Sequence, residues 1–220
     1  MIEKSLVCPV ELSACYWLDE VARLRQENQD LSDLVSTDAL TGLYNFRHFK
    51  NVLRAEMDRS KRSGIPTSLV MVDIDRFKTI NDTYGHEVGN LVLKRISGIL
   101  MSEVRITDIV CRYGGEEFAL IFPETYLRLA VNVADRIRET IAMTQIDYHG
   151  EGISVTVSMG ASVHLKSSIL SAGDFVDSVD KYLYEAKESG RNCIRHIDYA
   201  YLRTDTEVSV DERAMLVRAE

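Results

Sequence analysis

The sequence lacks the features that would tie it to a membrane or to an oxidising compartment. Its four cysteines are scattered and include no Cys-x-x-Cys pair, so we expect reduced thiols rather than a zinc site or a disulfide framework. No apolar run approaches the ~20 residues of a membrane span. The N-terminus also lacks a basic-then-apolar signal pattern. These absences predict a cytoplasmic protein without a membrane span.

Positive charge is also scarce. The 220 residues include 26 Lys and Arg against 34 Asp and Glu, a net charge of -8, which argues against a nucleic-acid partner. The same charge does not exclude a nucleotide that is bound through metal ions. With 45% hydrophobic and 27% charged residues, the composition is typical of a soluble globular protein. The length suits one domain with an appendage.

The first 35 residues carry a heptad repeat. Its seam positions alternate spacings of four and three, at Val10, Ala14, Trp17, Val21, Leu24, Asn28, Leu31 and Val35. This pattern favours a parallel two-stranded coiled coil, with Glu20 and Arg25 placed to pair between the two helices. The alternative is one amphipathic helix that packs on its own domain. We expect residues 1–35 to form a helix that joins two chains in a homodimer.

From residue 36 onward, hydrophobic periodicity predicts alternating helices and strands. We expect helices over 46–63, 88–100, 126–143 and 174–189, and strands over 68–75, 108–113, 117–122, 153–163 and 193–197. Asn45 would cap the first helix, and Gly190 would cap the last. The Gly114-Gly115 pair predicts a two-residue hairpin turn in which glycine adopts a positive φ.

The central order of these elements is β-α-β-β-α-β. This order predicts an α+β fold, in which a palm-like antiparallel sheet carries its helices on one face. We assign residues 36–197 to this domain. Residues 198–220 are charged, show no clear period, and are expected to form a C-terminal tail.

Acidic residues lie at the ends of two predicted strands. Asp73 ends the buried strand 68–75, and Glu116 and Glu117 follow the Gly-Gly pair. The first and third strands of this fold are neighbours, so these acids are expected to converge at one edge of the sheet. Converging carboxylates repel one another, and a divalent cation relieves the repulsion. The alternative is that these are solvated acids at strand ends.

Cationic and amide side chains follow in two segments. Lys78 and Asn81 come directly after the acidic strand, where a lysine offers a point charge to phosphate and an amide can bond a base edge. Lys187 and Arg191 stand four residues apart around the end of the last helix, a spacing that stacks side chains on one side. The alternative for this second pair is a complement to the helix dipole.

Five ordered motifs resemble the GGDEF family of diguanylate cyclases. They are Asp38-Ala-Leu-Thr-Gly-Leu, Asp73-Ile-Asp-Arg-Phe-Lys-Thr-Ile-Asn-Asp, Gly85-His86, Gly114-Gly-Glu-Glu-Phe118 and Ala186-Lys-Glu-Ser-Gly-Arg-Asn192. The resemblance spans roughly residues 36–197. It implies condensation of two GTP molecules into cyclic di-GMP with release of two pyrophosphates. It also implies a homodimer, because each domain supplies only half of a site.

The resemblance implies a role for each site residue. Asp73, the carbonyl of Ile74, and Glu116 would hold Mg²⁺, with Mn²⁺ as the alternative metal, and Glu117 would assist at a second metal. Glu116 would take the proton from the attacking 3′-hydroxyl, and the catalytic set would be Glu116, Glu117 and Lys78. The substrate-binding residues would be Phe77, Lys78, Asn81, His86, Asn90, Lys187 and Arg191, with Asn81 reading the guanine edge.

The resemblance also implies an inhibitory site for the product. Arg105 and Asp108 stand at the family's spacing ahead of Gly114, and their side chains suit guanine and phosphate groups. The alternative is a surface ion pair.

The chain departs from the family at Asn90, where many members have Asp. A carboxylate accepts from both guanine N–H groups, whereas an amide presents a donor to one of them. We therefore expect weaker guanine selectivity and some cyclic GMP-AMP. Two non-enzymatic alternatives are a cyclic di-GMP receptor that uses Arg105 and Asp108, and a scaffold that acts through residues 10–35. The intact acids and cations count against both.

Overall fold

The computed structural model of the protein describes residues 20–25, 27 and 36–198. The chain divides into two compact units, residues 1–36 and 37–220. In the first unit residues 20–25 and 27 are helical, and Arg23 pairs with Glu20 (2.7 Å) and Glu27 (2.5 Å) along the same helix. The predicted pair of Glu20 with Arg25 involves a second chain and stays a prediction. Most of the predicted heptad positions, and the tail from 199 on, lie outside the described residues.

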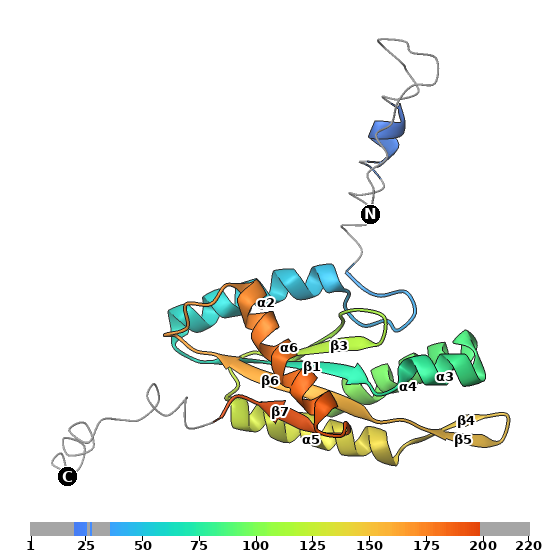
Figure 1. Ribbon diagram of the computed structural model, residues 1–220. Helices are drawn as coiled ribbons and strands as arrows, with labels where there is room; N and C mark the ends of the chain where they lie inside the picture. Colours follow the sequence, from blue (N-terminus) through green and yellow to red (C-terminus); the bar gives the residue numbers. More distant parts are fainter. Residues whose placement is uncertain (1–19, 26, 28–35, 199–220) are drawn as a thin grey trace. The chain divides into compact units, whose positions relative to one another are not determined.

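A five-stranded sheet forms the centre of the second unit (Figure 1). The strands lie in the order β2 (Ile109–Arg112), β3 (Glu117–Phe122), β1 (Thr67–Ile74), β6 (Val157–His164) and β7 (Ile194–His196). All neighbours are antiparallel except β6 and β7. The predicted α+β fold, with an antiparallel sheet and flanking helices, is confirmed.

Helices cover both faces of this sheet, where we expected them on one. They are α2 (Phe46–Ser63), α4 (His86–Glu103), α5 (Leu127–Met143) and α6 (Ala172–Glu188). Along β1, Val70 and Val72 pack with the core beneath α4 and α5, whereas Leu69 and Met71 pack with α2 and α6. All eight residues of β1 are buried. Successive side chains point to opposite faces, so a continuous apolar strand needs cover on both.

Glycine sets how closely α6 lies on the sheet. A Cβ at Gly160 of β6 would lie 2.3 Å from the Leu183 amide nitrogen and 2.4 Å from the Val179 carbonyl oxygen. Only a residue without a side chain lets the helix backbone come this near. This close approach matters for function because the last turn of α6 carries the predicted site residue Lys187.

Local sequence explains where the helices begin and end. The Asn45 side chain accepts the His48 amide (3.0 Å), as predicted for a helix cap. Ser171 and Asp174 form a capping box at the start of α6. At the other end of α6 the C-cap is Ser189, one residue before the predicted cap Gly190. Among the described residues, no helix combines the length and the apolar character needed to cross a membrane.

The single strand predicted over 153–163 is wrong, because two separate sheets share this stretch. β4 (Gln145–Tyr148) and β5 (Glu151–Ser154) form their own hairpin, which turns at His149 and Gly150 with positive φ. β6 then begins at Val157, and two residues separate it from the end of β5 at Ser154. The sequence hid this hairpin because its strands are short and its turn lacks the usual Asn-Gly or Asp-Gly pair.

Candidate active site

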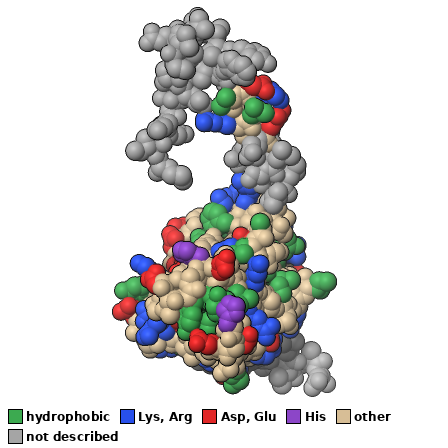
Figure 2. All heavy atoms as spheres, turned by 90° about the vertical axis from the view of Figure 1, so that its right-hand side faces the viewer, with side chains coloured by type: hydrophobic (Ala, Val, Ile, Leu, Met, Phe, Trp, Pro, Cys, Tyr) green, Lys and Arg blue, Asp and Glu red, His purple; other side chains and the backbone are tan. Residues whose placement is uncertain are grey.

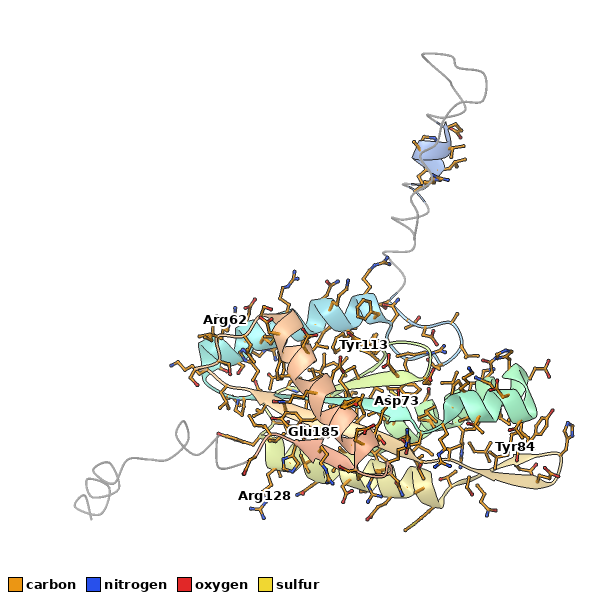
Figure 3. The ribbon with its side chains drawn as sticks, in the orientation of Figure 1. Arg62, Asp73, Tyr84, Tyr113, Arg128 and Glu185 are labelled. Atoms are coloured by element: carbon orange, nitrogen blue, oxygen red, sulfur yellow. The ribbon has the colours of Figure 1, made fainter. Side chains whose placement is uncertain are left out.

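The register of the central strands brings the predicted acids together. Asp73, near the end of β1, lies opposite Glu117, the first residue of β3. One residue further on, the Ile74 amide donates to the Glu116 carbonyl (3.3 Å). Figure 3 shows Asp73 where β1 leaves the sheet. Two acids that are 44 positions apart in sequence therefore face each other across one strand pair.

The Gly-Gly loop is not the turn that we predicted. Neither Gly114 nor Gly115 has a positive φ, and the Tyr113 and Gly114 amides both donate to the Glu117 carbonyl (2.8 and 3.2 Å). Glycine is needed here for another reason, because a Cβ at Gly114 would lie 2.7 Å from the Glu117 carboxylate oxygen Oε2. The first glycine therefore leaves room for the acidic side chain.

Arg112 ties this loop to the start of the domain. Its guanidinium donates to the carbonyl of Gly115 (2.7 Å) and to both carboxylate oxygens of Asp38 (3.1 Å each). The Asp38 carboxylate also accepts the backbone amide of Thr41 (2.9 Å). A two-pronged arginine contact of this kind fixes geometry as well as charge. Sequence reasoning treated residues 38–43 only as a motif and did not predict this contact.

Lys187 lies against the acids. Its Nζ atom is 2.7 Å from Asp73 Oδ2. Burial nonetheless raises the pKa of Asp73 above its usual value, while Lys187 and, more weakly, Arg191 act to lower it. Burial also raises the pKa of Glu117, and the negative charge of Asp73 raises it further. The site therefore gathers carboxylates that are costly to ionise together without additional positive charge.

The donor set at this end of the sheet suits a magnesium ion. Carboxylates of Asp73, Glu116 and Glu117 and the carbonyl of Ile74 are hard oxygen ligands, which Mg²⁺ and Mn²⁺ prefer. In the part of the chain that the structure describes, no three His, Cys, Asp or Glu side chains are grouped so that they could hold one metal ion, so Asp73, Glu116 and Glu117 do not form a ready-made metal site. Magnesium usually takes only one or two carboxylates and completes its shell with phosphate and water, so this open arrangement fits.

The segment after β1 carries the residues that were predicted to contact the guanine base and the phosphates, and it begins at the same end of the sheet as Asp73. Helix α3 (Phe77–Tyr84) begins with buried Phe77 and exposed Lys78, and α4 follows with exposed His86 and Asn90. Figure 2 views the domain from this side, where charged groups of both signs surround a small hydrophobic area.

Asn81 lies tightly against α4. A Cβ at Gly89 would lie 1.9 Å from the Asn81 Oδ1 atom and 3.2 Å from the Phe77 ring. Gly89 therefore allows α3 to pack on the start of α4, with Asn81 next to the residue that precedes Asn90. Sequence reasoning missed Gly89 as a site residue, and the signal was a glycine inside a helical pattern.

Asp75 is a second residue whose part in the site was missed. It is 7% exposed, and its carboxylate accepts the hydroxyls of Thr156 (2.7 Å) and Ser158 (2.6 Å) and the backbone amide of Asn192 (3.1 Å). Buried carboxylates are stabilised when donors satisfy them in this way. Asp75 therefore joins β1, β6 and the turn that carries Arg191.

Arg105 and Asp108 lie at the other end of β2 from the Gly-Gly loop. The contact between them runs from the Arg105 backbone amide to Asp108 Oδ2 (2.9 Å), and the Asp108 amide donates back to the Arg105 carbonyl (3.0 Å). Arg105 is exposed, and burial raises the pKa of Asp108 above its usual value. The two residues form a small turn, separated from the acids by the four-residue strand β2.

Comparison with known proteins identifies relatives of the same kind. Residues 35–193 match the family described as "Diguanylate cyclase, GGDEF domain". The response regulator PleD of Caulobacter vibrioides is 40% identical over 177 residues, which cover 78% of this chain and 38% of PleD. Diguanylate cyclase A of Treponema denticola is 38% identical over 175 residues, covering 78% of this chain and 47% of that protein. The chain thus spans less than half of the length of these curated relatives.

Solved structures agree with the sequence matches. The GGDEF domain of DgcB from Caulobacter crescentus, in complex with c-di-GMP, has a TM-score of 0.70 at 29% identity and covers 74% of this chain and 95% of its own. The active GGEEF domain of a diguanylate cyclase from Vibrio cholerae has a TM-score of 0.65 at 31% identity, covering 70% and 97%. These matches confirm the resemblance carried by the motifs. The chain belongs to the GGDEF-domain family of diguanylate cyclases.

Proposed function

We propose that this chain is a diguanylate cyclase, which condenses two GTP molecules into cyclic di-GMP and two pyrophosphates. The observation that carries the proposal is the end of the β1–β3 pair, where Asp73 faces Glu117 and Lys187 lies 2.7 Å from Asp73. Carboxylates that hold metal, set beside a cation that meets phosphate, are the parts that phosphoryl-type transfer requires.

Glu116 is proposed as the base that takes the proton from the attacking 3′-hydroxyl. It lies in the loop between β2 and β3, and its carbonyl is held by the Ile74 amide (3.3 Å). Asp73, Ile74 and Glu116 would hold the first metal, and Glu117 would assist at a second. When bound, Mg²⁺, or Mn²⁺ in its place, would neutralise phosphate charge and orient the attacking and leaving oxygens.

Lys78, Lys187 and Arg191 are proposed to bind the triphosphate. Lys78 is exposed in the first turn of α3, and Lys187 would exchange its contact with Asp73 for a phosphate oxygen as metal takes over the carboxylate. Lys78 would also help to stabilise charge that develops on the transferring group. Phe77, Asn81, His86 and Asn90 would surround the guanine, with Asn81 on the base edge.

Two copies of the domain are proposed to face each other in a homodimer, because one domain supplies only half of the reacting pair. Each 3′-hydroxyl then attacks the α-phosphate held by the partner. The N-terminal helix would tether the two domains, raising the concentration of one near the other. We place the reaction in the cytoplasm, where GTP is available.

The test is to incubate the purified chain, stripped of bound nucleotide, with GTP and Mg²⁺ and to identify the product by mass spectrometry. Wild type is expected to form cyclic di-GMP, and Glu116→Gln is expected to reduce turnover by about 10³-fold because it removes the base. Glu151→Gln, at an exposed position on the separate β4–β5 hairpin, is the matched control. If the wild-type chain binds cyclic di-GMP but does not turn over GTP, the result would favour the non-catalytic receptor and contradict the proposed cyclase activity.

Product inhibition is proposed at Arg105 and Asp108. The exposed Arg105 guanidinium offers a fork for guanine or phosphate, and the site lies apart from the acids, so product could bind there while GTP is in place. Arg105→Ala should raise the concentration of cyclic di-GMP that halves the rate, with kcat unchanged. Equal inhibition of both proteins would contradict this assignment.

Relaxed base selectivity is proposed for Asn90. It is exposed at the start of α4, beside Gly89 and near Asn81. With equimolar ATP and GTP, wild type should form some cyclic GMP-AMP, and Asn90→Asp should form less because a carboxylate pairs with both guanine N–H groups. A single cyclic di-GMP peak from wild type would rule this out.

A further inference from the structure

We propose that Asp75 is a positioning residue for the triphosphate, acting through the turn that carries Arg191. It lies two residues beyond Asp73, but it is neither in the proposed metal set nor in contact with the proposed substrate groups. The inference rests on the proposed function, which assigns Arg191 to the triphosphate.

The turn that follows α6 has an unusual backbone. Gly190, Arg191 and Asn192 have φ values of 105°, 66° and 45° in succession. Residues with side chains rarely adopt this left-handed region, and such positions persist only where neighbouring structure enforces them. This turn therefore needs external contacts to hold its conformation.

Asp75 supplies the buried contact. Its Oδ2 atom accepts the Asn192 backbone amide at 3.1 Å, across 117 positions of sequence. A second contact, from the Arg138 guanidinium to Asn192 Oδ1 (3.2 Å), is exposed. The Arg191 amide also donates to the Ala186 carbonyl (3.1 Å), which ties the turn back to α6. Of these contacts, the one from Asp75 links the turn to the central strands of the sheet.

The carboxylate is itself rigidly held. The Thr156 and Ser158 hydroxyls donate to its two oxygens at 2.7 and 2.6 Å, and the Asp75 amide donates to the Thr156 carbonyl (2.9 Å). The next residue, Arg76, has a φ of 55° and precedes α3, which carries Lys78. Asp75 thus stands between the two segments that the proposed function assigns to phosphate.

A carboxylate suits position 75 because it offers two acceptor oxygens to the donors around it. Three donors converge on it, and the Asn192 amide cannot rotate to become an acceptor. An asparagine at position 75 would still work if its oxygen faces the Asn192 amide and its NH₂ faces Ser158, whose hydroxyl can turn to accept. An alanine would leave all three donors without a partner.

The test is a double-mutant cycle on the full chain with Asp75→Ala and Arg191→Ala. The main measurement is the Kd for a GTP analogue with a methylene bridge between the α- and β-phosphates, which cannot be turned over; KM and kcat for GTP are measured alongside. Asp75→Ala should raise Kd and KM about tenfold, the size expected for one lost contact to a charged group, while kcat changes less than threefold. In the Arg191→Ala background, Asp75→Ala should raise Kd by less than a further twofold, because the two residues act through one contact.

Two further variants separate positioning from folding. Asp75→Asn should stay within about threefold of wild type in Kd, because its amide can satisfy the same donors. Thr156→Val keeps the shape of the side chain and removes one of the two donors to Asp75 Oδ2. It should raise Kd in the same direction as Asp75→Ala, by about fivefold, and it decides the matter if Asp75→Ala does not fold. Circular dichroism and thermal melting check that each variant is folded.

Effects of Asp75→Ala on Kd that multiply fully with those of Arg191→Ala, or a Kd unchanged by Asp75→Ala and Thr156→Val, would overturn the proposal. A wild type that binds the analogue but makes no cyclic di-GMP would defeat the proposed function alone, since the binding cycle still decides the role of Asp75.

Discussion

The two ends of strands β1 and β6 bury polar groups in opposite ways. At one end lie the carboxylates of Asp73 and Asp75, which are 8% and 7% exposed. At the other, the buried hydroxyls of Ser68 and Ser60 donate to the carbonyls of Thr125 (2.8 Å) and His164 (3.1 Å). The first end holds carboxylates, and the second holds mostly hydroxyl groups.

The difference between the two ends indicates that the carboxylate end is less stable than it could be because its charged groups serve the proposed reaction. A hydroxyl that bonds a backbone carbonyl satisfies both groups at little cost. Buried carboxylates that repel one another, as at Asp73 and Glu117, persist where charge has a use. The neutral end has its own exception in His164, which is fully buried with no hydrogen-bond partner on either ring nitrogen. Variants at the two ends should therefore change different properties.

The largest effect is expected at the charged end, from Asp73→Asn. Loss of this proposed metal ligand should lower turnover by about 10³-fold. Because burial raises the pKa of Asp73, its ionised form is disfavoured in the fold at neutral pH. The neutral variant should therefore melt at an equal or higher temperature, by up to about 3 °C. Activity assays and thermal melts check both; a clear loss of thermal stability would contradict the comparison.

The next largest effect, about tenfold in KM for GTP, is expected from the uncharged residue Gly89. Gly89→Ala places a Cβ 1.9 Å from Asn81 Oδ1, so Asn81 must move and KM for GTP should rise about tenfold. Gly98→Ala on the same helix has nothing within 4 Å of its new Cβ and is the matched control. The control should keep its KM and gain about 0.5–1 kcal/mol of stability. Equal KM values for the two variants would show that Asn81 is not held by Gly89.

The smallest effect is expected at His164, and it concerns stability alone. Burial lowers the pKa of His164; on α2, Lys61 adds to the lowering while Asp58 opposes it, and Phe175 of α6 stacks edge-on against the ring. As pH falls below about 6.5, the unfolded chain takes up the proton and the folded chain does not. The resulting contribution to stability is complete above that pH and is lost below it.

His164→Phe should remove this dependence. Urea unfolding at pH 7.5 and 5.5 should show wild type losing about 1 kcal/mol more than the variant, because only the unfolded wild-type chain takes up the proton on the His164 imidazole below about pH 6.5. Turnover at pH 7.5 should match wild type. His149→Asn, at an exposed position in the β4–β5 turn, is the matched control for the loss of a histidine. Identical pH profiles for wild type and His164→Phe would contradict this account, because they would mean that the imidazole takes up its proton as readily in the fold as in the unfolded chain.

Sequence reasoning predicted most elements from local signals. The Asn45 cap, the buried strand that ends at Asp73 and the helix over 126–143 depend on neighbouring residues, and each lies within a residue or two of its prediction. It failed for the β4–β5 hairpin and for the Gly114-Gly115 backbone, because short strands and glycine pairs permit several conformations. The assigned roles of the site residues remain predictions.

The order of the strands, the acids that end them and the family motifs were all determined by the sequence itself, because periodicity and motif spacing are properties of neighbouring residues. Only the tertiary structure decided that helices cover both faces, that Gly89 makes room for Asn81 and that Asp75 holds the Asn192 turn. These features join residues far apart in sequence. Their cause is packing and hydrogen bonding between distant segments, which no local pattern records.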